Sequence, residues 1–219
     1  MTENTDLDPN PYTPPAAELV ARSSTSAPDY PVEFVDFWPR VLARLIDCGP
    51  KLGAGLFGHM LALQSASSLA ARTGTDFRTA WALLTNSRFQ WVLLGLLGAS
   101  AYQVICEAGS GSTLGKFVLD MVVLDERGLP CGPVAAIVRN VLYFLDILIF
   151  GSLAAVTMGG SPMKQRVGDK RARTIVVRRR STRPSSLRSP ERFLLILVVA
   201  VLCDSLIVAS PSVIRSLSL

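Results

Sequence analysis

Two groups of charged side chains recur at helical spacing inside segments that are otherwise apolar. Arg40, Arg44 and Asp47 fall at positions i, i+4 and i+7, so they share one face of a helix. Arg139 and Asp146 are again seven residues apart, in a second apolar segment. A charge near the centre of a bilayer costs roughly 2.5–3.5 kcal/mol on insertion scales, so such residues usually face partners or water-filled cavities. These residues are therefore the first candidates for a functional site.

The charges allow two interpretations. In the first, arginines and aspartates on different helices pair across a bundle, and the resulting ion pairs fix how the helices pack. In the second, the charges line a path for a cation or proton, in which an aspartate exchanges its partner for cargo. Asp47 raises the question most sharply, because it lies about 13 Å deeper than Trp38 along a helix. The residue types alone fit both interpretations.

The elements that position these charges follow from composition. The chain has 219 residues, of which 49% are hydrophobic, and only 18% are charged, against about 25% in soluble domains. Its mean hydropathy is +0.37. Four apolar windows stand out, at about 38–63, 89–106, 133–157 and 193–209. We therefore predict an all-α membrane protein, a small helical bundle of about four hydrophobic segments.

Two short β-branched runs stand apart from these windows. Residues 121–124 precede turn residues, and residues 174–177 precede several arginines. Such runs favour strands, and we predict that they pair as a short cytoplasmic β-ribbon. The window between them would then be re-entrant or a broken helix pair, with Gly151 a candidate break, because it is too short for two full spans. The alternative is one ordinary span with the strands on opposite sides of the membrane.

The segments outside the windows differ sharply in charge. Residues 1–36 hold seven acids and one arginine together with several prolines, which predicts a disordered acidic tail. Residues 158–192 hold eleven Lys/Arg and two acids, which indicates a cytoplasmic location. Within this stretch, we expect residues 179–192 to form a basic linker that lies against anionic lipid headgroups. It lacks interleaved aromatic residues, so we expect no nucleic acid as a partner.

Enzyme chemistry has little support in the sequence. His59 is the single histidine, and no serine lies in a nucleophile-elbow context. The four cysteines are scattered, without the spacing of a metal or redox motif. The Gly-Ser-rich stretch 109–116 fails the phosphate-loop pattern, because Phe117 stands where Ser or Thr is required. We therefore expect no enzyme and no cofactor.

Several motifs in one order resemble the RDD family of bacterial membrane proteins. They are residues 37–47 (FWPRVLARLID), 111–116 (GSTLGK), 122–128 (VVLDERG), 139–140 (RN) and 165–177 (QRVGDKRARTIVV). The family is named for an arginine and two aspartates, and the resemblance places these at Arg40, Asp47 and Asp169, with Arg166 in the last motif. It implies an RDD-like membrane domain over residues 37–178 and an additional C-terminal transmembrane segment over 193–219.

The resemblance says more about fold than about activity, although some family members have been linked to transport, including sodium/proton exchange. It implies a multi-pass protein of a bacterial inner membrane that transports or exchanges a small solute or cation. The alternative is a non-transporting scaffold that docks a protein or anionic lipid through its basic cytoplasmic loop. Four short helices enclose little volume, so we expect a transporting form to be a homo-oligomer. Glycines at 53, 55, 58, 95 and 98 could serve its contacts or packing within one chain.

Overall fold

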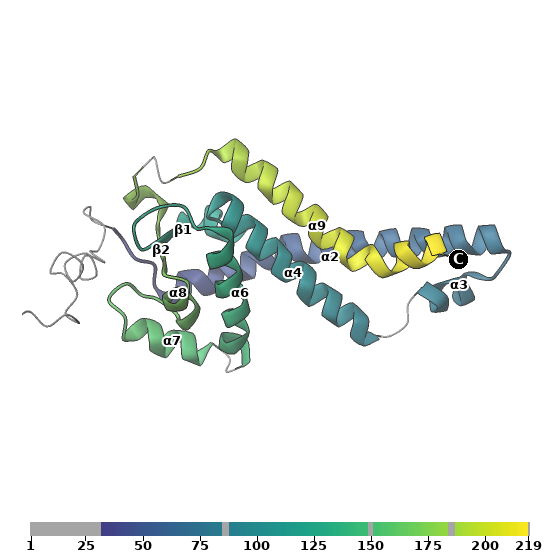
Figure 1. Cartoon of the computed structure of the whole chain (residues 1–219), viewed down its shortest axis with the longest axis horizontal. Coiled ribbons are helices and arrows are strands. Elements are labelled where there is room, and N and C mark those ends of the chain that lie inside the picture. The colour runs from purple at the N-terminus through teal and green to yellow at the C-terminus, as the bar shows by residue number, and fades with distance from the viewer. Residues whose placement is uncertain (1–31, 85–87, 149–150, 184–186, 219) are drawn as a thin grey trace, which may run out of the picture.

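The chain folds into a helical rod with a more complex, charged end. The computed structural model describes residues 32–84, 88–148, 151–183 and 187–218. Figure 1 shows the β-ribbon and the short helices gathered at one end of the molecule, while the C-terminus and helix α3 (Phe77–Leu84) lie at the other. The described part is mostly helical, as the sequence predicted.

Three long helices build the rod. Helix α2 (Phe37–Thr73) has 37 residues and is therefore about 55 Å long at 1.5 Å per residue. Helix α4 (Arg88–Ser110) and helix α9 (Pro190–Ser218) pack against each other, and α9 also packs along α2. Close approach is possible because a glycine stands at each contact: a Cβ at Gly58 would lie 2.7 Å from the Ser205 carbonyl oxygen, and Gly98 adjoins Asp204.

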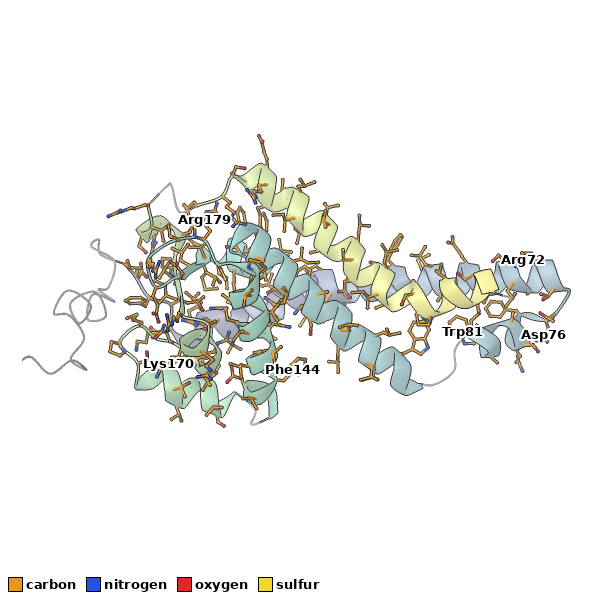
Figure 2. The ribbon with its side chains drawn as sticks, in the orientation of Figure 1. Arg72, Asp76, Trp81, Phe144, Lys170 and Arg179 are labelled. Atoms are coloured by element: carbon orange, nitrogen blue, oxygen red, sulfur yellow. The ribbon has the colours of Figure 1, made fainter. Side chains whose placement is uncertain are left out.

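Two of these helices are long and apolar enough to cross a membrane, namely Trp91–Ser110 within α4 and Pro190–Val213 within α9. Only 28% and 33% of their residues are buried inside the protein, so most of each apolar helix faces outward. An outward apolar surface of this length suits lipid rather than water. The protein is therefore expected at a membrane, and Figure 2 shows charged side chains such as Arg179 and Arg72 towards opposite ends of the rod.

The predicted β-ribbon is confirmed. Strand β1 (Met121–Asp125) pairs antiparallel with strand β2 (Thr174–Arg178), so that Val123 lies opposite Val176. Residues 33–35 run along the other edge of β2, where the Val35 amide donates to the Val176 carbonyl at 3.0 Å. The predicted disordered tail lies mostly outside the described residues, but its last part is thus ordered, because Val35 is buried in the core.

The window between the strands is a broken helix pair. Helix α6 (Pro133–Leu148) is followed by α7 (Ser152–Gly159), and Gly151 precedes α7 with a left-handed φ of 77°. Because both strands lie in one ribbon, the chain must return to the side from which it left. The structure therefore supports the broken-pair interpretation and excludes a single straight span with the strands on opposite sides.

Two short helices connect the ribbon to the long helices. Helix α5 (Leu114–Val118) packs against α2, and helix α8 (Val167–Arg171) packs against α6. Gly115 of α5 lies so close to α2 that a Cβ there would collide with the carbonyl group of Ala43. Only glycine allows this approach, which brings α5 against the charged part of α2.

Several arginines at the end of β2 and after it have partners within the protein. Arg178 and Arg180 lie 3.4 and 3.2 Å from Glu33, and Arg188 donates to the Ala108 carbonyl at the end of α4 at 2.6 Å. These guanidinium groups have protein partners, since they join the 3₁₀ turn Arg179–Ser181 and the start of α9 to the charged end. That residues 179–192 lie against anionic lipid headgroups stays a prediction.

Replacement of Gly115 tests the α2–α5 contact. We expect Gly115→Ala to lower the free energy of unfolding by about 1–3 kcal/mol, because overpacking forces the backbones apart. Gly53→Ala is the matched control, since Gly53 lies in α2 with nothing within 4 Å of its Cβ position. It should leave stability unchanged or raise it by up to about 1 kcal/mol. Thermal unfolding of the detergent-solubilised chain measures both, and equal effects would contradict the proposed contact.

Candidate functional site

Asp169 is the centre of a buried group of charges at the ribbon end. It lies on α8, is fully buried, and contacts Arg40 of α2 at 2.6 Å and Arg139 of α6 at 2.8 Å. Arg166 approaches the same carboxylate at 3.8 Å. Burial by itself would raise the pKa of Asp169, but the charges of Arg139, Arg166 and Arg40 outweigh it and hold this pKa well below its ordinary value.

Glu107 is a second buried acid, which the sequence analysis did not identify. It lies near the end of α4, where its carboxylate contacts Arg139 at 3.1 Å and also pairs with Lys116 of α5. Burial lowers the pKa of Lys116 to about 8, although the charge of Glu107 acts in the opposite direction. The sequence position of Glu107 could have marked it as a candidate, because it is the single acid in the segment that joins the second apolar window to the Gly-Ser-rich motif.

The two acids join five elements through one series of ion pairs. Arg139 contacts both Asp169 and Glu107, so the series runs from Arg40 to Lys116. Its members come from α2, α8, α6, α4 and α5. Removal of one partner from such a buried pair typically costs about 3–5 kcal/mol, because the other charge stays desolvated. This network corresponds to the first of our two interpretations, in which ion pairs fix helix packing.

Asp47 forms no ion pair with any arginine that the structure describes, unlike in the first of our two interpretations. Its fully buried carboxylate accepts hydrogen bonds from the Thr113 hydroxyl at 2.7 Å, the Gly115 amide at 2.8 Å and the Tyr102 hydroxyl at 3.3 Å. The reason is geometric: α5 begins directly beside Asp47, and its unpaired amide groups are good donors to a carboxylate. Asp47 therefore holds α5 on α2.

Arg44 and Lys51 form a contrasting pair of cations on α2. Arg44 donates to the side-chain oxygen of Gln103, and Lys51 donates to the same oxygen at 3.3 Å. The Arg44 guanidinium also lies 4.1 Å from the centre of the Tyr143 ring. Neither cation forms an ion pair with any residue that the structure describes. They are positive charges held by a neutral amide and aromatic rings.

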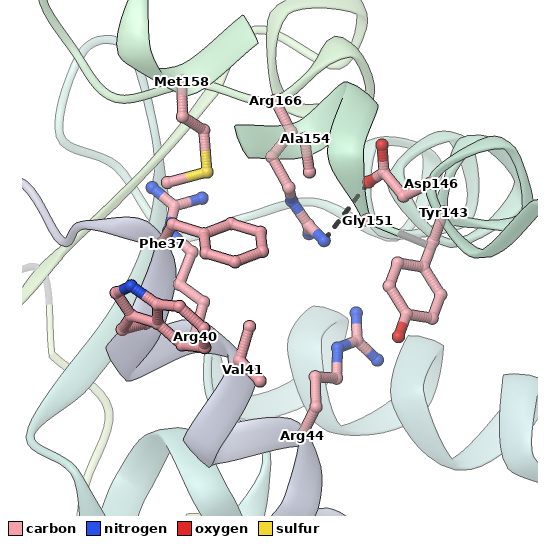
Figure 3. A pocket seen from close by; sticks show the side chains of 11 residues that line it. Phe37, Arg40, Val41, Arg44, Tyr143, Asp146, Gly151, Ala154, Met158 and Arg166 are labelled. Carbon is pink, nitrogen blue, oxygen red and sulfur yellow. Dashed lines mark ion pairs between the residues drawn. The ribbon is translucent and has the colours of Figure 1, made fainter. Parts of the chain in front are cut away.

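Two cavities meet at Arg44 and Tyr143, which line both. The larger cavity has a volume of about 460 Å³ and lies between α2, α6, α7 and α8. Figure 3 shows Arg44 and Arg166 pointing into it from opposite sides. The smaller cavity, of about 150 Å³, lies between α2, α4 and α6 and includes Lys51 and Asn140 in its lining. The charges that line the two cavities are mostly positive.

Asp146 and Arg166 form the remaining ion pair of the site. Their side chains lie 3.5 Å apart at the edge of the larger cavity, as the dashed line in Figure 3 marks. Arg166 also lies 5.5 Å from the Tyr143 ring centre. Arg139 shares a helix face with Asp146 but pairs with Glu107 and Asp169. Asp146 thus belongs to the cavity rather than to the structural network.

The structure brings the seven predicted residues to one end of the molecule but divides their roles. Four of them form the structural network or hold α5, and three line the larger cavity, which Arg40 of the network also lines. The structural members are Arg40, Arg139 and Asp169 with Asp47 beside them, and the cavity members are Arg44, Asp146 and Arg166. Lys51, Gln103 and Tyr143 were not predicted, because only the fold shows that they adjoin Arg44.

Fold and site together define a class: a small membrane-associated helical protein with a two-stranded ribbon and a buried network of ion pairs beneath its charged end. Comparison with known proteins identifies the family. The chain belongs to the RDD family, whose model matches residues 34–173. No curated protein and no solved structure matches the chain. The arginine and two aspartates assigned by resemblance, Arg40, Asp47 and Asp169, are all buried within the matched range.

The network predicts a specific dependence of stability on pH. The pKa of Asp169 lies below its unfolded value of 3.8, so its stabilisation is complete above that value and is lost as the pH falls through the folded pKa. We expect Asp169→Asn to cost about 3–5 kcal/mol at neutral pH. The variant should also lose less stability than the wild type between pH 5 and pH 2, because the Asp169 carboxyl of the unfolded wild type takes up its proton in this range while the folded one stays ionised.

Thermal unfolding of both proteins across this pH range measures the effect. Asp120→Asn is the control, because this aspartate is half-exposed in the turn before β1 and lies 3.9 Å from Arg180. Parallel pH curves for the wild type and Asp169→Asn would contradict the assignment of Asp169 as the compensated acid.

Proposed function

We propose that this RDD protein transports a small solute that carries an anionic group, across a bacterial inner membrane that it crosses several times. The observation that carries the proposal is the state of Arg44 and Lys51. Both are cations inside the helical assembly, at cavities, and without an acid partner among the described residues. Removal of a cation from bulk water costs free energy, and a group of opposite charge beside it offsets that cost.

The arrangement of the cavities gives a route. The larger cavity adjoins the ribbon end, and the smaller one lies further along α2, on the side of Lys51. Arg44 and Tyr143 line both cavities, and the Arg44 guanidinium carbon lies 4.1 Å from the centre of the Tyr143 ring. A solute that moves from one cavity to the other must therefore pass this pair, and its anionic group would exchange the Arg44 guanidinium for the Lys51 ammonium.

The lining favours an anionic group over the cation that the family resemblance suggests. Arg40, Arg44 and Arg166 line the larger cavity against one aspartate, Asp146, and Lys51 lines the smaller one. In a narrow site that excludes water, rings of one sign of charge select solutes of the opposite sign. A free metal cation would meet repulsion from these side chains along the proposed route.

The rival function, a scaffold that docks lipid or protein through the basic loop, has less support. Arg178 and Arg180 contact Glu33, and Arg188 caps the end of α4, so these arginines already have partners within the chain. A homo-oligomer remains part of the transport proposal, because Gly53, Gly55 and Gly95 have open space at their Cβ positions and could admit a second copy.

Uptake into proteoliposomes tests the proposal. The full chain is reconstituted, and radiolabelled chloride, phosphate, acetate, 4-methylpentanoate and L-leucine are compared with sodium. We expect at least one solute with an anionic group to enter faster than into empty vesicles, and faster than sodium. Arg44→Gln should slow that uptake by roughly tenfold or more, since a charge-assisted hydrogen bond is worth about 1.5–3 kcal/mol.

The matched control is Arg72→Gln, because Arg72 is an exposed arginine in the last turn of the same helix. It should leave uptake unchanged at equal protein density. Uptake of sodium above that of every anionic solute would contradict the proposal, as would an Arg44→Gln variant that folds and transports like the wild type.

A further inference from the structure

The larger cavity presents both signs of charge, and each has an unused hydrogen-bonding position. The Oδ1 atom of Asp146 and the Nε atom of Arg166 are buried, and neither has a hydrogen-bond partner among the residues that the structure describes. The two residues are only 4% and 9% exposed. A buried carboxylate oxygen needs a donor, so Asp146 lacks one. The Nε atom of Arg166 lies 3.8 Å from Oδ2 of Asp169, which is beyond hydrogen-bond distance, so the Arg166 guanidinium can take a further acceptor.

The acceptor position is reinforced by Arg44. The Arg44 and Arg166 guanidinium carbons lie 4.1 and 5.5 Å from the centre of the Tyr143 ring, and the charge of Arg166 is among those that act on Arg44. Two like charges around one ring repel each other. A carboxylate between them would relieve this repulsion and accept hydrogen bonds from both side chains.

Apart from Arg40, which is paired with Asp169, the remaining walls of the cavity are mostly apolar. Figure 3 shows Phe37, Val41, Ala154 and Met158 around the space that the charged groups face. The volume of about 460 Å³ falls within the range of about 300–1,000 Å³ that small-molecule sites occupy. A ligand that fills it should therefore carry an apolar side chain as well as its charged groups.

We infer that the larger cavity binds a zwitterion, a small α-amino acid with an apolar side chain. Its carboxylate lies between Arg44 and Arg166, its ammonium donates to Oδ1 of Asp146, and its side chain packs against Phe37 and Met158. This inference rests on the proposed function and names the class of its solute. A simple carboxylate would satisfy the arginines but would leave Asp146 without a donor.

Calorimetric titration of the full detergent-solubilised chain tests the inference with three probes of similar shape. L-Leucine carries both charged groups, 4-methylpentanoate lacks the ammonium, and isopentylamine lacks the carboxylate. We expect leucine to bind at least about tenfold more tightly than either, because each lost partner leaves a buried charged group unpaired. The comparison uses the wild-type protein, so it does not depend on the folding of a variant.

A variant then assigns the ammonium position. Asp146→Asn should bring the affinity for leucine down to that for 4-methylpentanoate and leave the latter unchanged or improved. Asp120→Asn is the control, because it removes an aspartate from the ribbon surface, away from the cavity lining. It should bind all three probes like the wild type.

The outcomes separate this inference from the proposed function. Equal binding of leucine and 4-methylpentanoate would overturn the zwitterion and leave transport of an anionic solute standing. No binding of any probe would also overturn it, whatever the uptake of chloride or phosphate. Tight binding of leucine without uptake of leucine or of any other anionic solute into vesicles would support the site and reject transport.

Discussion

The structure depends on the pairing of two buried carboxylates, Asp169 and Glu107, with more cations than they can neutralise. Asp169 contacts Arg40 and Arg139, and Glu107 contacts Arg139 and Lys116. The desolvation cost of each buried carboxylate is offset only because several positive charges surround it. The pairs hold α2, α4, α5, α6 and α8 together, and the ribbon follows because α8 leads directly into β2 and α5 into β1.

The same surplus of positive charge accounts for the mostly positive lining of the two cavities. Once the two carboxylates are committed to the network, no acid of the described residues pairs with Arg44 or Lys51. Gln103 accepts from both cations and donates to Glu107 at 3.2 Å, so a neutral amide separates the structural charges from the free ones. Neighbouring residues thus serve two purposes. The paired charges stabilise the fold, and Arg44 and Lys51 are available to the proposed solute.

Much of the fold could be predicted from local sequence, because periodicity and β-branched runs act over a few residues. The long helices and the ribbon followed from such patterns, and the break at Gly151 was one of two alternatives that the patterns left open. The partners within the site did not, since they depend on contacts between distant segments. An arginine partner for Asp47 belonged to one of the two interpretations left open, but Gly115 lets α5 approach α2 so closely that the Thr113 hydroxyl and the Gly115 amide reach Asp47 instead. Spacing along one helix carries no information about that approach.

The central claim is that Arg44 and Lys51 bind the anionic group of the solute. Placing an isosteric acid beside the two cations tests this claim most directly. Asn140 is buried and lines the smaller cavity together with both cations. Asn140→Asp should supply the missing negative charge, so we expect the variant to keep its thermal stability while uptake of the fastest anionic solute falls by about tenfold or more. Uptake equal to that of the wild type, in a variant of equal stability, would contradict the claim.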